Sequence, residues 1–67
     1  MTTVVFQGRR VSTGETTVAA FLAANGVDAA SALVEYGGEV YAPGTLPVSL
    51  ELSDGAELNV FRVVAGG

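Results

Sequence analysis

The pattern of apolar and polar residues at the start of the chain indicates a β-hairpin. Residues 3–7 are rich in β-branched and aromatic side chains, and residues 10–12 continue the extended pattern. Between them, Gly8-Arg9 offers a two-residue turn, because glycine accepts the positive φ that tight hairpin turns require. The first part of the chain therefore predicts two antiparallel strands.

A helical pattern follows the first hairpin. Thr16 or Thr17 precedes it and can act as the N-cap, because a threonine hydroxyl accepts a hydrogen bond from a free amide of the first helical turn. Gly26 is expected to end the helix in the left-handed conformation, with Val27 folding back onto the last turn. The apolar face, with the i, i+3, i+4 spacing of a helix, consists of Val18, Phe21 and Leu22.

A second hairpin is predicted from residues 32–36 and 39–41, which flank a pair of glycines. Apolar side chains occupy both faces of residues 32–36, so the pattern leaves the orientation of this strand open. Val34 and Tyr36 accordingly have two interpretations. They either belong to the core or extend an exposed apolar patch near the end of the chain.

Prolines and glycines in residues 42–56 predict an irregular connection with a short or irregular extended piece over residues 48–52. This connection leads to the longest β-prone run, residues 57–64. Leu58 and Val60 lie on one face of this strand, and Phe61 lies on the other. If the first two side chains pack against the helix, Phe61 lies on the open face of the sheet, where apolar side chains mark docking sites.

Composition excludes several classes of function. The chain of 67 residues has a net charge of −4 and contains no cysteine, histidine or lysine. The usual nucleophiles, general bases and zinc ligands are therefore missing, so neither a catalytic site nor a metal site is expected. Three arginines are too few for a nucleic-acid surface. The acidic balance instead fits a basic partner surface, or serves solubility alone.

The hydropathy pattern argues against a membrane protein. The longest apolar run, residues 18–24, is far too short to span a bilayer, and no basic segment followed by an apolar one begins the chain. Cysteine is also absent, which is compatible with a reducing compartment. A soluble cytoplasmic protein without a membrane partner is therefore predicted.

The sequence ends with the apolar residues Val63 and Val64, followed by Ala65, Gly66 and Gly67. Without side chains beyond a methyl group, the last three residues can enter a narrow cleft in backbone conformations closed to other residues. Three extended residues reach roughly 10 Å from the folded body. Such a tail presents the α-carboxylate of Gly67 to another enzyme, although a frayed chain end has the same appearance.

One helix beside four or five strands predicts an α+β roll, in which the helix covers one face of a mixed sheet and leaves the other open. With its diglycine end, this arrangement resembles the ubiquitin-like β-grasp, and within it the ThiS family of sulfur carriers of thiamine biosynthesis. The resemblance is carried by the segments VVFQG, GETTVAAFLAANGV, YGGEV, SDGAELNVFRV and VVAGG. It implies a β-grasp domain over residues 1–64 and a flexible diglycine tail over residues 65–67.

The resemblance also implies a carrier function. In this family an E1-like, ThiF-like enzyme uses ATP and Mg²⁺ to adenylate the terminal carboxylate, here that of Gly67. Sulfur from a persulfide enzyme then gives a thiocarboxylate, which a ThiG-like thiazole synthase consumes. The chain itself would bind no cofactor and would not be an enzyme. Gly66 and Ala65 would pass through the narrow channel of the activating enzyme.

Four residues before the tail are predicted to dock on the partner: Phe61, Arg62, Val63 and Val64. Phe61 is the expected aromatic anchor. Arg62 either pairs with a partner carboxylate or is simply solvated. The two valines either face the partner or pack within the strand.

Other functions share the same features. A molybdopterin-synthase small subunit, or a carrier for another sulfur-containing metabolite, would have the same fold and tail. A ubiquitin-like modifier would use the same adenylate but form an isopeptide bond. A β-grasp binding module with an incidental Gly66-Gly67 would keep its function without the tail.

Overall fold

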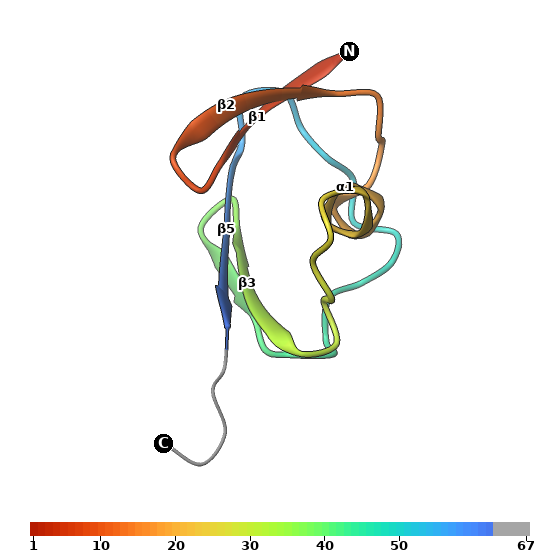
Figure 1. Cartoon of the computed structure of the whole chain (residues 1–67), viewed down its shortest axis with the longest axis vertical. Helices are drawn as coiled ribbons and strands as arrows, with labels where there is room; N and C mark the ends of the chain where they lie inside the picture. Colours follow the sequence, from red (N-terminus) through yellow and green to blue (C-terminus); the bar gives the residue numbers. More distant parts are fainter. Residues whose placement is uncertain (63–67) are drawn as a thin grey trace.

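The computed structural model describes residues 1–62 as a small α+β unit with one mixed five-stranded sheet and one helix. Its elements are β1 (Thr2–Phe6), β2 (Arg9–Thr13), α1 (Val18–Ala24), β3 (Ala32–Tyr36), β4 (Glu39–Tyr41) and β5 (Glu57–Arg62). The strand order is β2-β1-β5-β3-β4, in which β1 and β5 are parallel and the other neighbours are antiparallel. Helix α1 lies on one side of the sheet (Figure 1). The α+β arrangement expected from the sequence is confirmed.

The first hairpin turns one residue earlier than predicted. Phe6 pairs with Arg9, so the turn consists of Gln7 and Gly8 and not of Gly8-Arg9. Gln7 and Gly8 have φ angles of 51° and 81°, as in a type I′ turn, whose twist matches that of the flanking strands. The prediction failed because glutamine is not a usual residue at positive φ.

Both ends of helix α1 agree with the sequence. Thr17 is the N-cap, and its hydroxyl accepts a hydrogen bond of 3.1 Å from the amide of Ala20. Gly26 follows the helix with a φ of 75°, and the amide of Val27 donates to the carbonyl of Leu22 over 2.9 Å. This 6→1 bond is typical of a Schellman end, which satisfies a free carbonyl of the last turn. Within residues 1–62, no helix has the length and apolar character needed to cross a membrane.

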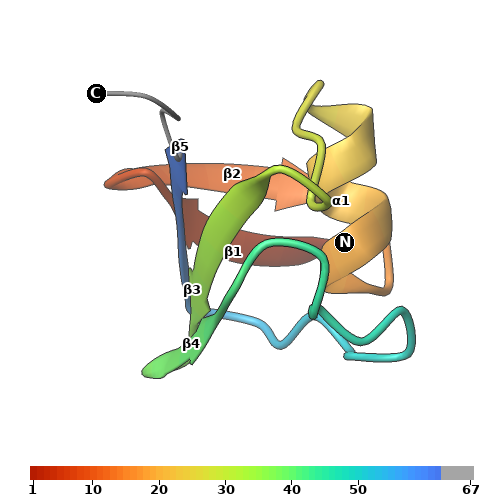
Figure 2. The same ribbon diagram turned by 90° about the horizontal axis from the view of Figure 1, so that it is seen from below.

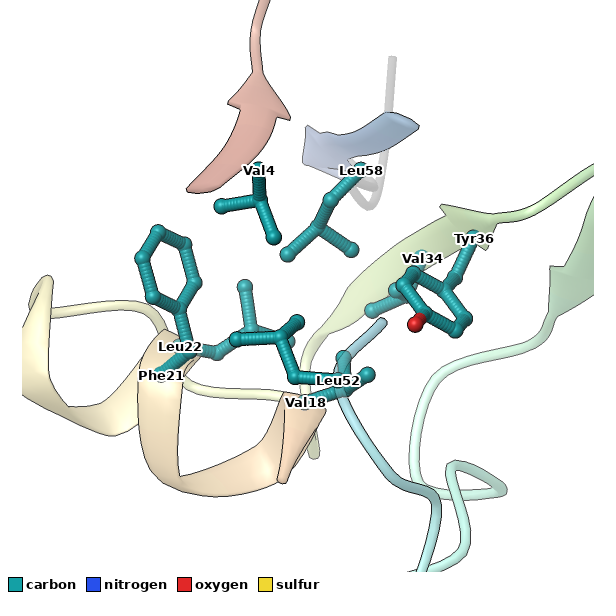
Figure 3. Packing of buried hydrophobic residues seen from close by; sticks show 8 residues of the cluster. All are labelled: Val4, Val18, Phe21, Leu22, Val34, Tyr36, Leu52 and Leu58. Atoms are coloured by element: carbon teal, nitrogen blue, oxygen red, sulfur yellow. The ribbon is translucent and has the colours of Figure 1, made fainter. Parts of the chain in front are cut away.

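The core lies between the helix and the covered face of the sheet. Phe21 is 1% exposed, and its ring meets that of Phe6 edge-on, with centroids 5.1 Å apart. Such an arrangement is favourable for aromatic pairs. Figure 3 shows the core side chains converging from the helix, the strands and the last connection: Val4, Val18, Phe21, Leu22, Val34, Tyr36, Leu52 and Leu58.

The orientation of β3, left open by the sequence, is settled by its pairing with β5. Val34 lies opposite Val60, and Tyr36 lies opposite Leu58, so all four side chains face the helix. Val34 and Tyr36 are only 1% and 8% exposed. The idea that these two residues extend an exposed patch is therefore wrong, and Leu33 takes that place on the open face.

The irregular segment between β4 and β5 is anchored by the hydroxyl of Tyr36. It donates to the carbonyl of Glu51 over 3.0 Å and accepts from the amide of Ser53 over 2.7 Å. Between these two residues, Leu52 enters the core. Figure 2 shows this segment passing from β4 along the helix side of the sheet before it reaches β5. The expected irregular connection is confirmed, and two of its backbone polar groups are satisfied by one side chain.

Candidate functional site

Strand β5 places the residues that precede the diglycine end. It lies in the centre of the sheet, between β1 and β3. Leu58 is fully buried under the helix and Val60 packs against the same core, whereas Phe61 is 53% exposed on the opposite face. This alternation confirms the predicted position of Phe61. A large aromatic side chain thus remains accessible near the end of the strand.

Phe61 has an apolar neighbour that the sequence analysis missed. Leu33 of β3 is its register partner, and both side chains point to the open face. We call these two residues the apolar pair. Leu33 is half-buried, so part of its side chain is also accessible. The signal that identifies it is the alternation along β3, which becomes informative once Val34 is known to be buried.

Two acidic residues lie on the open face to one side of the apolar pair. The amide of Asn59 donates to the carboxylate of Glu35 over 3.0 Å. Glu57 lies on the same side of β5 as Asn59, and both carboxylates line a small hollow of about 300 Å³ beside the second hairpin turn. Of these two residues, Glu35 lies nearer to the apolar pair in the register, and Glu57 lies further along β5, four residues from Phe61.

Arg62 does not join this surface. Residues alternate along a strand, so Arg62 lies on the opposite side from Phe61, opposite Ala32 in the register. There it lines an open groove of about 570 Å³ between the end of β5 and the segment that follows the helix. The predicted docking residues are therefore divided between two faces. Arg62 and Phe61 cannot both lie at the centre of one flat interface.

The groove has mixed chemistry. Val27 and Val60 are its apolar lining residues, and Asp28 and Arg62 are charged residues of opposite sign that also line it. Gln7 also lines it, from the turn between β1 and β2. Gln7 is not predicted as a site residue, because the sequence pattern places it within a strand.

The remaining predicted site residues, Val63, Val64, Ala65, Gly66 and Gly67, lie outside the described residues. Among residues 1–62, no group of three or more His, Cys, Asp or Glu side chains is arranged to hold a metal ion. The described site is an exposed surface of apolar and acidic side chains.

Comparisons with protein-family models, with curated proteins and with solved structures find no match.

Proposed function

We propose that this chain is a ThiS-type sulfur carrier with a β-grasp fold, whose Gly67 carboxylate is adenylated and then converted to a thiocarboxylate. The observation that carries the proposal is the position of Phe61. It is 53% exposed on the uncovered face of the strand that leads to Gly66 and Gly67. A carrier without catalytic groups needs such a surface, because its partner must bind it before acting on its end.

The described architecture supports this proposal through its compatibility with a β-grasp. The first and last strands lie parallel in the centre of the sheet, with β2 on the outer side of β1 and β3 on the outer side of β5. One helix covers one face, and the other face is left for a partner. In such an arrangement the last strand is held firmly at the point from which it leads to the reacting end of the chain.

The chemistry proposed for Gly67 follows from the poor reactivity of a carboxylate. One carboxylate oxygen attacks the α-phosphorus of ATP, and pyrophosphate leaves. The terminal sulfur of a persulfide then displaces AMP from the acyl adenylate. A donor thiol attacks the sulfur–sulfur bond, which leaves the thiocarboxylate on Gly67 and a disulfide on the donor. ATP, Mg²⁺ and the thiols belong to the partners, and this chain supplies the acyl group and the docking surface.

The thiocarboxylate is proposed to supply sulfur for the thiazole ring of thiamine, through a ThiG-like synthase. Its sulfur is a better nucleophile than a carboxylate oxygen, and transfer returns the carrier with an ordinary carboxylate. The reaction takes place within the partner complexes. A cytoplasmic location is proposed on the same grounds, because the ATP and persulfide chemistry requires a reducing compartment.

Intact-mass measurement tests the proposal directly. After co-expression with the E1-like enzyme and its sulfur donor, replacement of one oxygen by sulfur should add about 16 Da. Fragmentation should place the added mass on Gly67. Conjugation would instead add the mass of a whole protein to a lysine elsewhere, and would favour a ubiquitin-like modifier.

A truncated chain without Gly66 and Gly67 provides the control. Glycine has no side chain, so the truncation removes no apolar side chain and the melting temperature should stay the same. ATP–pyrophosphate exchange with the E1-like enzyme should disappear, because the reacting carboxylate is displaced toward the body by two residues. Normal exchange by the truncated chain would eliminate the sulfur-carrier proposal.

A further inference from the structure

The side chain of Gln7 continues the sheet where strand β1 ends. β1 pairs with β5 through Val5 and Phe6, and the backbone amide of Gln7 then donates to the carbonyl of Leu58 over 3.0 Å. Beyond this point the backbone turns away into β2, and the side-chain amide of Gln7 makes the next two hydrogen bonds to β5. Its nitrogen donates to the carbonyl of Val60 over 3.0 Å, and its oxygen accepts from the amide of Val60 over 3.1 Å.

These two bonds reproduce the pattern of a neighbouring strand. A strand residue offers one donor and one acceptor to the edge beside it, and a carboxamide carries the same two groups. Val60 is thereby satisfied on the β1 side of β5 without any strand lying there. We call this pair of hydrogen bonds the Gln7 clamp.

The backbone conformation of Gln7 indicates that the side chain has a specific use. It is the one non-glycine residue with a positive φ in residues 1–62. The first position of a type I′ turn normally carries asparagine, aspartate or glycine, which accept this conformation more easily. Glutamine thus departs from the local rule, and the bonds to Val60 supply a compensating gain.

The clamp acts on the last part of β5. On the other edge, Phe61 pairs with Leu33 and Arg62 pairs with Ala32 of β3. With the clamp present, the strand is held from both sides up to Val60. Without it, the last residues of β5 would be held by β3 alone, and water would compete for the exposed amide and carbonyl of Val60.

We infer that Gln7 is a positioning residue for the carrier chemistry. It does not contact the reacting atoms. By fixing the backbone at Val60, it sets the position and direction of Arg62, from which residues 63–67 continue. This inference rests on the proposed function, because a fixed end of β5 matters only if a partner must receive the residues beyond it. Loss of the clamp should reduce the fraction of bound carriers that are correctly aligned for adenylation.

Two substitutions separate the clamp from the turn. In Gln7→Asn, the new residue suits the positive φ of the turn, but its side chain is one methylene shorter and cannot reach both groups of Val60. In Gln7→Glu, the length is kept, but an ionised carboxylate has no proton to donate to the carbonyl of Val60. Both variants should remain folded, and the melting temperature of the Asn variant should match or exceed that of the wild type.

The first measurement is amide hydrogen exchange, which needs no partner. In Gln7→Asn the amide of Val60 should exchange at least about tenfold faster, whereas in Gln7→Glu the carboxylate can still accept from that amide and only the bond to the Val60 carbonyl is lost. In both variants the amide of Val5, bonded to Ala56 between β1 and β5, should be unchanged. Unchanged exchange at Val60 in Gln7→Asn would overturn the clamp. An equal increase in the exchange rates of both amides would indicate general destabilisation of the fold, and it would overturn the positioning role as well.

The second measurement is ATP–pyrophosphate exchange with the E1-like enzyme. Both variants should lower kcat by roughly tenfold and leave KM within about twofold, because Phe61 still docks normally while the acyl group is misaligned. A looser Val60 with unchanged kcat would refute the positioning role. If the wild-type chain gives no exchange at all, the proposed function fails and the positioning role fails with it, whereas the hydrogen-exchange result would still establish the clamp.

Discussion

Replacement of Phe61 by serine separates docking from folding in a single variant. Phe61 is 53% exposed, and a phenylalanine side chain buries about 200 Å² when fully enclosed, so roughly 100 Å² is available to a partner. At about 25 cal/mol per Å², covering that area contributes up to about 2.5 kcal/mol of binding free energy. Phe61→Ser should therefore weaken binding to the E1-like enzyme by at least about tenfold, and by up to about seventyfold if the pocket encloses the whole ring.

The measurement is a binding isotherm with the activating enzyme, accompanied by a melting curve of the free carrier. Phe61 lies outside the buried core, so the free energy of unfolding should fall by only about 1 kcal/mol. Val40→Ser is the matched control. Val40 belongs to β4, is 60% exposed and lies on the same open face, but it is not adjacent to Phe61 in the register. Its replacement should leave affinity within about threefold.

Two results would refute the reasoning. If Phe61→Ser unfolds the free carrier, the ring is part of the core and the two faces of β5 are wrongly assigned. If the variant is folded and binds normally, the apolar pair is not the docking surface. Loss of affinity in Val40→Ser alone would then move that surface to the β4 edge of the sheet.

Further predictions concern the core and the anchored connection. Phe21→Ala should cost about 3–5 kcal/mol, a large part of the roughly 3–10 kcal/mol expected for a domain of this size, and a urea curve close to that of the wild type would contradict the assigned helix face. Where Phe21→Ala does not fold, Phe21→Leu should cost roughly 1–2 kcal/mol, measured in the same way. Tyr36→Phe removes two hydrogen bonds and should lower the free energy of unfolding by about 1–3 kcal/mol. Relative to the wild type, hydrogen exchange should accelerate more at the amide of Ser53 than at that of Val60, and an unchanged rate at Ser53 would contradict the anchor.

The helix was predictable because its signals are local. Spacing identified Val18, Phe21 and Leu22 as the buried face, and all three are buried. The capping threonine and the final glycine act within one turn of the residues that they affect. Similarly, the alternation of Leu58, Val60 and Phe61 was sufficient to place Phe61 on the open face once a single helix was expected.

The orientation of β3 was not predictable, because its two faces are similar in sequence. Leu33 competes with Val34 and Tyr36 for the core, and hydrophobicity alone does not separate them. Pairing with β5 decides the matter, since a shift of one residue would turn every side chain of β3 to the other face. This information lies in contacts between distant parts of the chain. The same holds for the parallel pairing of β1 with β5.

The first turn was misplaced for a different reason. A glycine usually marks a tight turn, and Gly8 does so here, but the sequence does not show whether it takes the first or the second position. Gln7 takes the first despite its unfavourable φ, and its side chain gains two hydrogen bonds to Val60 that compensate for this cost. The partner in this compensation lies in β5, more than fifty positions away. Propensities of neighbouring residues cannot predict an effect of such a distant interaction.

In the proposed carrier, stability and recognition depend on opposite sides of strand β5. Leu58 and Val60 face the helix and contribute to the core, so changes there alter folding. Phe61 faces the open side beside its register partner Leu33 and stays half-exposed. A single-layer sheet with one helix therefore lets the docking surface vary at little cost to the fold. The Gln7 clamp joins the two functions, because it fixes the backbone between the buried side chains and the residues that a partner must receive.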